Sequence, residues 1–451
     1  MNEEKKKKRV LIKTLGCKLN YAETSAILEG FFQSGWKIAA GGETPDLVII
    51  HTCAVTGQAG QKSRQQIRKM IKRYPQSRIA VVGCYAQLSP DTIETISGVD
   101  VILGFHEKFI TKKYISDSER AIYREVSSLG AMQEAVPAHS LLYDRASGRT
   151  RAFLKIQDGC DYGCAYCTIP LARGRSRSVP FEKVMEGAAR LAATGYREIV
   201  LTGVNIADYR SGSATIVELL QGLDAIDTGR IRISSIEPDI LSDRLIETVA
   251  SSSKIMPHFH LPLQSGSDDI LAAMRRRYTS GGYRERLLKA VEAIPDCAVG
   301  ADVITGYPGE TAADFRTTFR FLETLPAAYL HVFTCSVRPG TALEEQVSSG
   351  RRKKVPSETA RARSSQLLKL AETKHREFAR QYVGKKLDVL FEECSTAESG
   401  ERTLSGYSGN YLRVNVTVSS SYDPLKLVGR ERTVSIENMD AGLFLEGRFV
   451  I

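Results

Sequence analysis

Short hydrophobic runs alternate with longer amphipathic segments through the first third of the chain. Apolar runs at residues 10–12, 47–50 and 79–82 flank segments 20–35 and 58–73, in which apolar side chains recur at helical spacing. Alternation of this kind is typical of a parallel sheet covered by helices on both faces. We therefore predict an α/β protein whose amino-terminal domain is a doubly wound parallel sheet.

The alternation continues through the middle of the chain, where helical segments such as 181–194 and 312–325 separate six further apolar runs. Six βα units are fewer than the eight of a closed barrel, so we predict a partial (βα)6 barrel. Its carboxyl-end loops should hold the functional site. The candidate strands are residues 152–156, 198–202, 231–236, 258–263, 299–304 and 329–334.

After a strongly basic helical stretch at 351–386, the pattern changes to the period of two that antiparallel strands show. A small antiparallel β-barrel and a plain accessory sheet both satisfy this pattern. The polar stretch 112–148 lacks periodicity and is interpreted as a connection. The candidate strands are residues 386–392, 410–416 and 431–435. The expected domains are residues 1–140, 146–375 and 378–451.

Composition narrows the class of protein. The chain has 451 residues, 42% hydrophobic and 25% charged, which is ordinary for a globular protein of several domains. The formal net charge of +10 favours a polyanionic partner such as nucleic acid over a merely soluble basic protein. No apolar run approaches the roughly 20 residues that span a bilayer. We expect a cytoplasmic protein that is not inserted in a membrane, in which disulfides are unusual.

Three cysteines, Cys160, Cys164 and Cys167, follow the first strand of the predicted barrel. Structural zinc usually takes four ligands, and no histidine lies nearby to complete such a site. An iron–sulfur cluster is also ligated by cysteine, and three protein ligands would leave one iron open for a substrate. Ligand number is thus compatible with a four-iron cluster, and zinc or redox-active thiols are the alternatives at this point.

Three further cysteines, Cys17, Cys53 and Cys84, each follow an apolar run of the amino-terminal domain. Carboxyl ends of parallel strands meet at one edge of a sheet, so the thiols should converge there. A single buried cysteine would mean little. Three in the same structural context predict a second cluster site.

Other chemistry-bearing residues carry weaker signals. Arginine runs are usually solvated faces, but one run lies within ten residues of Cys167, so we expect contacts with RNA phosphate or an anionic substrate group. We expect His258 and His260 to serve packing or local hydrogen bonds, and Cys297, Cys335 and Cys394 to be structural. The candidate RNA contacts are Arg173, Arg175, Arg177, Arg275, Arg276 and Arg277.

The cysteine spacing, with Tyr166 before Cys167, resembles the signature of the radical S-adenosylmethionine (SAM) enzymes. The runs 14–20, 51–56 and 82–84 are similar to the amino-terminal domain of the radical-SAM methylthiotransferases within that group. That family usually has Asn where this chain has His51, which affects local hydrogen bonding rather than ligation. The carboxyl-terminal strands resemble the TRAM domain, an RNA-binding barrel, where Tyr407 and Tyr411 would either stack on bases or belong to the core.

The resemblance implies two 4Fe-4S clusters, a catalytic one on Cys160, Cys164 and Cys167 and an auxiliary one on the amino-terminal cysteines. It also implies two SAM molecules, a methyl donor and a radical source. Polar residues at strand ends, each an ordinary turn by itself, then resemble SAM-binding motifs. The implied SAM contacts are Tyr166 (adenine), Thr202 and Gly203 (amino group), Ser235 and Glu237 (ribose), Gln264 and Asp302.

Within the family, the chain looks most like the branch that methylthiolates carbon 2 of N6-threonylcarbamoyladenosine beside the tRNA anticodon. The implied partners are the anticodon stem-loop and an electron donor. Sister branches act on isopentenyladenosine in tRNA or on an aspartate of a ribosomal protein. A threonylcarbamoyl carboxylate would favour Arg or Lys in the substrate pocket, whereas an isopentenyl group would favour apolar walls. The alternative from another class is a non-catalytic iron–sulfur RNA-binding protein.

Overall fold

The computed structural model describes residues 7–40, 42–54, 56–115, 122–128, 150–418 and 423–450. It divides into two compact units. Unit 1 comprises residues 1–147, 155–179 and 336–344, and unit 2 comprises residues 148–154, 180–335 and 345–451. Most of the expected connection at 112–148 lies outside the described residues.

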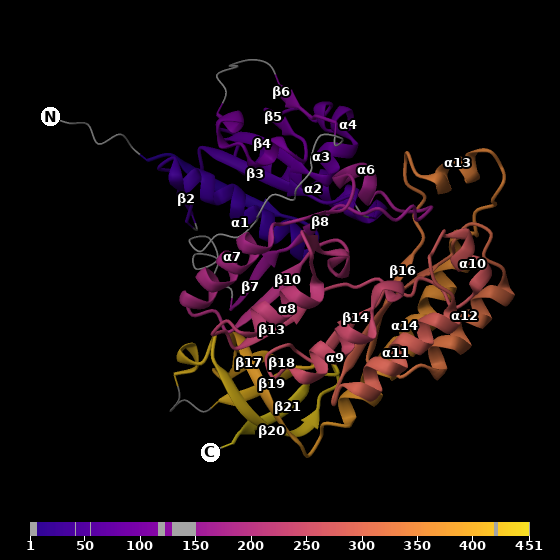
Figure 1. Ribbon diagram of the computed structural model, residues 1–451. Helices are drawn as coiled ribbons and strands as arrows, with labels where there is room; N and C mark the ends of the chain where they lie inside the picture. Colours follow the sequence, from indigo (N-terminus) through magenta and orange to yellow (C-terminus); the bar gives the residue numbers. More distant parts are fainter. Residues whose placement is uncertain are drawn as a thin grey trace. The chain divides into compact units, whose positions relative to one another are not determined.

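Unit 1 is built on a six-stranded sheet in the order β2-β1-β3-β4-β5-β6, in which neighbouring strands are parallel (Figure 1). Separate apolar cores lie on its two faces, so the predicted doubly wound sheet is confirmed. The strands are β1 Arg9–Thr14, β2 Lys37–Ile38, β3 Leu47–Thr52, β4 Arg78–Gly83, β5 Val101–Leu103 and β6 Tyr123–Glu125.

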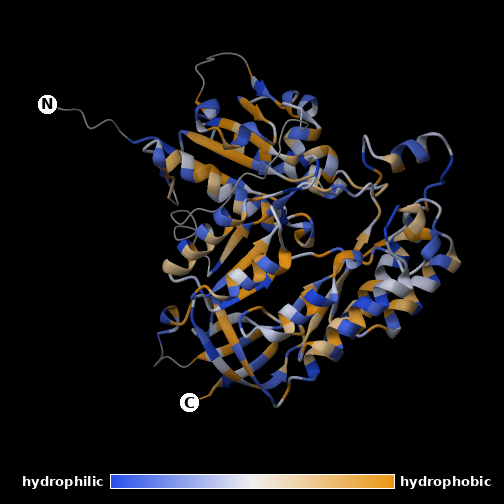
Figure 2. Cartoon of the chain, viewed as in Figure 1, coloured by the Kyte–Doolittle hydropathy of each residue, from blue (hydrophilic) through white to orange (hydrophobic). Residues whose placement is uncertain are grey.

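The helices of unit 1 follow from the same pattern. All six residues of β3 are buried, whereas α2 buries only one face, and Figure 2 shows this contrast as hydrophobic strands beside mixed helices. Thr56 caps α2 by accepting a hydrogen bond from Ala59 N at 3.1 Å. The main helices are α1 Lys18–Gln33, α2 Gly57–Arg73, α3 Cys84–Leu88, α4 Pro90–Glu94 and α6 Ile169–Arg173. The two-residue strands β8 Gln157–Asp158 and β9 Arg177–Ser178 form an antiparallel pair that closes the loop containing the three cysteines and α6.

Unit 2 contains two three-stranded sheets, β13-β10-β7 and β14-β15-β16. Parallel bridges from Ile231 to Ile255 and from Ser235 to His260 connect them, which gives the predicted six-stranded partial barrel. The strands are β7 Arg151–Lys155, β10 Glu198–Thr202, β13 Arg230–Ile233, β14 His258–His260, β15 Ala298–Thr305 and β16 Tyr329–Thr334. The covering helices are α7 Phe181–Ala193, α8 Ile216–Asp224, α9 Asp243–Ser251, α10 Asp268–Ala273, α11 Ser280–Ala293, α12 Ala312–Thr324 and α14 Ser357–Arg380.

The carboxyl-terminal strands close into a five-stranded barrel in the order β17-β18-β19-β21-β20, which confirms the predicted barrel. One pairing, β19 with β21, is parallel rather than antiparallel. The strands are β17 Lys386–Thr396, β18 Arg402–Ser408, β19 Arg413–Val418, β20 Glu431–Met439 and β21 Leu445–Phe449. Among the described residues, no helix is both long and apolar enough to cross a membrane.

Candidate functional site

The amino-terminal cysteines lie after the carboxyl ends of three neighbouring strands, β1, β3 and β4, as the sequence predicts. Cys53 and Cys84 are buried, whereas Cys17 is exposed. Gly16 has a φ of +102°, and a Cβ added there would lie 2.6 Å from Cys53 Cβ. Only glycine therefore lets the Cys17 turn approach Cys53 this closely.

Buried polar side chains tie these turns together. Asn20 Nδ2 donates to Leu15 O at 2.8 Å and to Thr52 O at 3.1 Å, which joins the Cys17 turn to the turn after β3. His51 Nδ1 lies 2.9 Å from Thr24 Oγ1, and burial holds the pKa of His51 well below its ordinary value. His51 is therefore a neutral residue engaged in local hydrogen bonding.

The second cysteine loop begins at the β8–β9 strand pair and is shaped by backbone hydrogen bonds. Cys160 N donates to Gly174 O, and Cys167 N to Cys164 O, both at 3.1 Å. Two amides donate to sulfur at 3.4 Å: Tyr162 N to Cys160 Sγ and Ile169 N to Cys167 Sγ. Such donors stabilise thiolates, and hydrogen bonds to sulfur tune iron–sulfur clusters. The chemistry of this donor set thus fits a cluster held by three cysteines.

A buried charge network connects the segments that carry the two cysteine sets in unit 1. Arg173, six residues after Cys167, donates to Glu23 Oε1 and Asp158 Oδ1 at 2.9 Å and to Asn20 Oδ1 at 2.7 Å. The ammonium groups of Lys108 and Lys155 bind Glu23 at 2.7 and 2.9 Å. Burial alone would raise the pKa of Glu23, but these three cations lower it well below its ordinary value.

This charge network also affects the electrostatic environment of the amino-terminal cysteine thiols. Its three cations face two carboxylates, which leaves one positive charge in excess. Arg173 interacts electrostatically with both Cys17 and Cys84. Burial raises the pKa of Cys17 above its ordinary value, and the nearby Arg173 guanidinium offsets part of this rise because a cation favours the thiolate.

The structure corrects part of the expected RNA surface. Arg173 is 1% exposed and Arg177 is 5% exposed, so neither guanidinium is available to phosphate. The Arg276 side chain is buried and paired with Glu237. In contrast, Arg175 is exposed, as are Arg275 and Arg277. Two of the three arginines expected near the cysteine loop thus hold the fold rather than a ligand.

The predicted SAM contacts, apart from Tyr166 in the cysteine loop, lie in unit 2, at the end of β10, in the loops after β13 and β14, and, for Asp302, within β15. Thr202 ends β10, and its buried Oγ1 has no hydrogen-bond partner among the described residues. The next loops are joined by Asn205 Oδ1, which accepts from Glu237 N at 3.3 Å. The backbone of Gln264 is held against β15 because its backbone N–H donates to Asp302 O at 2.7 Å. The buried Thr202 hydroxyl without a partner, next to Gly203, is consistent with a ligand-binding site.

Two histidines that sequence reasoning did not assign to the site lie among these residues. His260 Nδ1 is 2.7 Å from Ser235 Oγ, and His260 Nε2 is 2.8 Å from Asp302 Oδ1. His331 Nδ1 lies 3.1 Å from the same Asp302 oxygen. The expectation of local hydrogen bonds for His260 is confirmed. The period-two spacing of His258 and His260 was the available signal, whereas nothing local marked His331.

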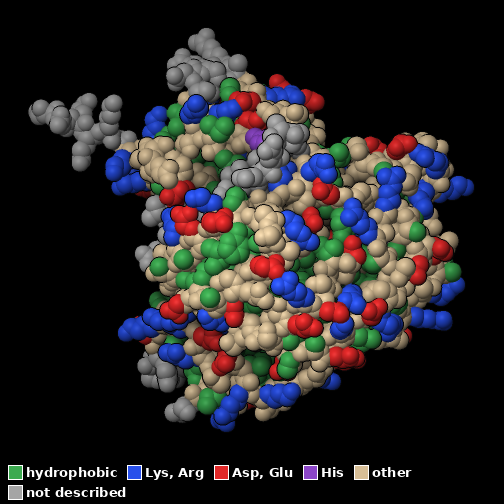
Figure 3. Space-filling model, viewed as in Figure 1, with side chains coloured by type: hydrophobic (Ala, Val, Ile, Leu, Met, Phe, Trp, Pro, Cys, Tyr) green, Lys and Arg blue, Asp and Glu red, His purple; other side chains and the backbone are tan. Residues whose placement is uncertain are grey.

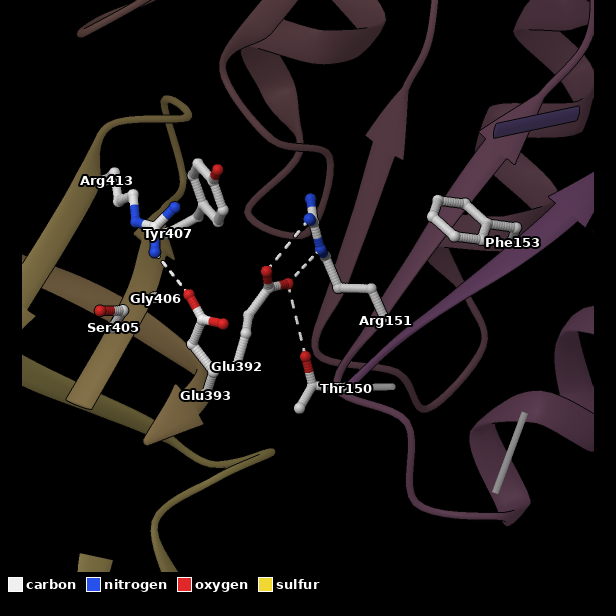
Figure 4. Close-up of a pocket in the computed structure, with 9 residues that line it drawn as sticks. All are labelled: Thr150, Arg151, Phe153, Glu392, Glu393, Ser405, Gly406, Tyr407 and Arg413. Carbon is white, nitrogen blue, oxygen red and sulfur yellow. Dashed lines mark hydrogen bonds and ion pairs between the residues drawn. The ribbon is translucent and has the colours of Figure 1, made fainter. Parts of the chain in front are cut away.

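A cavity of about 310 Å³ lies elsewhere in unit 2, between β7 and the carboxyl-terminal barrel (Figure 4). Its charged groups pair with each other: Arg151 and Thr150 bind Glu392, and Arg413 binds Glu393. None of the predicted SAM contacts lines it. Because its charged groups are already paired with each other, we interpret the cavity as a gap in the packing between β7 and the barrel, not as the SAM site.

Comparisons with known proteins agree with this organisation. Residues 154–322 match the model of the Radical SAM superfamily, and residues 9–104 match that of uncharacterized protein family UPF0004. The radical SAM methyltransferase TsrM from Kitasatospora setae has the same fold, with a TM-score of 0.57 and 15% identity over 76% of this chain and 78% of its own.

Two relatives are similar over most of their length. The threonylcarbamoyladenosine tRNA methylthiotransferase MtaB of Bacillus subtilis is 38% identical, covering 98% of this chain and 96% of the relative. A tRNA-2-methylthio-N(6)-dimethylallyladenosine synthase of Anaeromyxobacter is 34% identical, covering 88% and 85%. With cysteines placed in both domains, this similarity identifies the chain as a member of the radical-SAM methylthiotransferase family.

Proposed function

We propose that this enzyme methylthiolates carbon 2 of N6-threonylcarbamoyladenosine at position 37 of tRNA. The observation that carries the proposal is the 38% identity to an MtaB protein across almost the whole chain. Relatives named for dimethylallyladenosine reach 34% identity over less of it, so methylthiolation of isopentenyladenosine is the second candidate. Methylthiolation of an aspartate in a ribosomal protein is the third.

We propose that Cys160, Cys164 and Cys167 hold the catalytic 4Fe-4S cluster and that Cys17, Cys53 and Cys84 hold an auxiliary one. The amide donors to Cys160 and Cys167 and the positive charge of Arg173 beside Cys17 and Cys84 support this assignment. When bound, such clusters supply the electron that cleaves SAM and the site of sulfur transfer. The backbone hydrogen bonds of the cysteine loop and the Asn20 contacts between the amino-terminal turns would hold these ligands in place.

The strand-end residues of unit 2 are proposed to bind SAM. Thr202 and Gly203 would receive the amino group, and Ser235 and Glu237 the ribose, with Gln264 and Asp302 beside them and Tyr166 at the adenine. The unpartnered hydroxyl of Thr202 supports this role. His260 orients two of these side chains, since its ring bonds both Ser235 and Asp302.

The RNA partner is proposed to be the anticodon stem-loop, bound in part by the TRAM-like barrel and by exposed Arg175, Arg275 and Arg277. On the face shown in Figure 3, Lys and Arg side chains intermingle with Asp and Glu instead of forming one patch. Binding should therefore rest on distributed phosphate contacts and weaken steeply with salt. We also propose a separate electron donor, a cytoplasmic location, and the division into residues 1–140, 146–375 and 378–451.

Nucleoside mass spectrometry of tRNA from a deletion strain tests the substrate. We expect the methylthio group to disappear from threonylcarbamoyladenosine and to return when the gene is restored. Its persistence there, together with loss from isopentenyladenosine, would establish the second candidate instead.

Replacement of Cys17, Cys53 and Cys84 by Ala tests the division between the clusters. The triple variant should still form 5′-deoxyadenosine from SAM with reductant but should not methylthiolate RNA. Loss of both reactions would refute the division. Absence of 5′-deoxyadenosine in the reconstituted unmodified enzyme would favour the non-catalytic RNA-binding alternative.

A further inference from the structure

One face of β16 carries a row of three ring side chains, of which the last two are exposed. Tyr329, His331 and Phe333 alternate along the strand, and neighbouring rings in the row lie 5.1 and 6.5 Å apart between centroids. The other face packs on α14, because Leu330 is buried and Thr334 Oγ1 lies 3.0 Å from Ser364 Oγ of that helix. The row therefore lies on the sheet face opposite α14.

The last two rings of the row are exposed to solvent, whereas side chains of a hydrophobic core are buried. The His331 side chain is 54% exposed and Phe333 is 41% exposed, although both sit on a strand of the central sheet. Tyr329 at the base of the row is anchored, since a Cβ on Gly300 of the neighbouring strand would lie 2.0 Å from its ring. An exposed aromatic beside a polar ring, at the carboxyl end of a parallel strand, is typical of ligand-binding surfaces.

His331 is held in a defined orientation by Asp302, its cross-strand neighbour. Hydrogen bonds from His260 and His331 overcome burial and keep the pKa of Asp302 below its ordinary value, so this carboxylate is ionised. An ionised acceptor requires the proton of His331 on Nδ1. Nε2 is then at the other end of the ring, and the exposure of the side chain leaves it accessible to a ligand.

We propose that His331 recognises the carboxylate of the substrate adenosine through Nε2, while Phe333 stacks on the base. This inference rests on the proposed function, because only threonylcarbamoyladenosine among the candidate nucleosides carries that carboxylate. A protonated His331 ring can donate to an anion from Nε2 while Nδ1 donates to Asp302. The expected Arg or Lys of the substrate pocket is thus replaced by a histidine backed by an aspartate.

A carboxylate could also come from the methionine part of SAM, so the test must separate the two sources. We suggest an anticodon stem-loop bearing threonylcarbamoyladenosine and the same RNA with its carboxylate blocked as a methyl ester. Binding and kcat/KM are measured for the reconstituted enzyme, its His331→Asn variant and its Phe333→Leu variant. Asn retains a donor for Asp302 but removes the Nε2 end of the ring. Thr334→Ala, on the opposite face of β16, is the matched control.

For the unaltered enzyme, the ester should lower affinity and kcat/KM about tenfold, the loss of one charge-assisted hydrogen bond. His331→Asn should show a similar loss on the free acid and no further loss on the ester. Phe333→Leu should weaken both RNAs equally, and Thr334→Ala should change neither. Melting temperature and iron content should match the unaltered enzyme in every variant.

Other outcomes overturn the inference. Equal losses on acid and ester in His331→Asn would show that His331 does not read the carboxylate. A raised KM for SAM during RNA-independent cleavage would assign His331 to the SAM carboxylate instead. Stoichiometric zinc or manganese that is lost in His331→Asn would make His260, Asp302 and His331, whose ligand atoms lie within 4.8 Å, a metal site. If the unaltered enzyme acts only on isopentenyladenosine RNA, the proposed function itself fails.

Discussion

Arg173 makes buried contacts that reach across 150 residues of sequence in unit 1. Its guanidinium binds Glu23, Asn20 and Asp158, and it lies over the Phe105 ring at 5.2 Å. Sequence analysis placed this arginine on a solvated or RNA-binding face because it belongs to an Arg-rich run. No periodicity marks a charge that is buried against partners distant in sequence. The positions of Cys17, Cys53 and Cys84 after strand ends were predictable, because they follow from local apolar runs.

Replacing Arg173 with Ala should destabilise unit 1 by about 2–3 kcal/mol, because Glu23, Asp158 and Asn20 would lose buried hydrogen bonds from a charged donor. Chemical denaturation of the cluster-free chain measures this. Arg175→Ala, whose side chain is 89% exposed, is the matched control and should change stability by less than about 0.5 kcal/mol. Equal effects of the two substitutions would contradict the role given to the network.

Glu198 predicts a pH dependence of stability in unit 2. Burial alone would raise its pKa, but Arg232 binds both carboxylate oxygens, at 2.7 and 3.1 Å, and holds the pKa below the ordinary 4.5. A lowered carboxyl pKa stabilises the fold above about pH 4.5, and this stabilisation is lost as the pH falls toward the folded-state pKa.

Glu198→Gln should therefore cost about 3–5 kcal/mol at pH 7, because Arg232 loses its buried counter-ion. The same variant should lose less stability than the unaltered chain between pH 6 and 3.5. Urea midpoints of the cluster-free chain at several pH values test this, with exposed Glu247→Gln as control. A parallel pH slope in both proteins would show that Glu198 is not the titrating group.

Among the elements, the strands of the partial barrel in unit 2 were the most predictable. The expected strand 198–202 coincides with β10, and 329–334 with β16, because apolar runs between turn residues mark buried parallel strands. The two-residue strands β8 and β9 were missed, since Gln157 and Asp158 carry no hydrophobic signal. They form because Gln157 Nε2 donates to Gly159 O at 2.8 Å and to Ser176 Oγ at 3.0 Å.

This strand pair predicts a sharp difference between two glycines of the cysteine loop. Gly159 has a φ of +69°, and a Cβ there would lie 1.9 Å from Arg175 O, whereas a Cβ on Gly163 would meet nothing within 4 Å. Gly159→Ala should therefore displace Cys160 and lower the iron bound after anaerobic reconstitution by up to about half, if two clusters are present. The Gly163→Ala variant should bind as much iron as the unaltered enzyme. Equal iron in both variants would contradict this account.

At the scale of the molecule, the carboxyl-terminal barrel is part of unit 2 rather than an appended module. Arg230, which is 3% exposed, donates to Asp388 O at 2.7 Å and Tyr407 O at 3.0 Å. Arg232 donates to Gly409 O at 2.9 Å and lies over the Tyr411 ring at 4.8 Å. Tyr407 and Tyr411, considered for base stacking, stack on each other at 4.9 Å within this packing.

Deletion of residues 386–451 should consequently destabilise the central sheet as well as weaken RNA binding. Two buried arginines, Arg230 and Arg232, would lose backbone acceptors and stacking partners together. Hydrogen exchange of β10 and β13 in the cluster-free chain measures the effect, and both strands should lose protection. Full-length Arg402→Ala and Arg432→Ala, which change exposed barrel residues, should keep it. If the barrel stabilises β10 and β13, its removal must lower their protection from hydrogen exchange. Unchanged protection after the deletion would therefore show that the stability of these strands does not depend on the barrel.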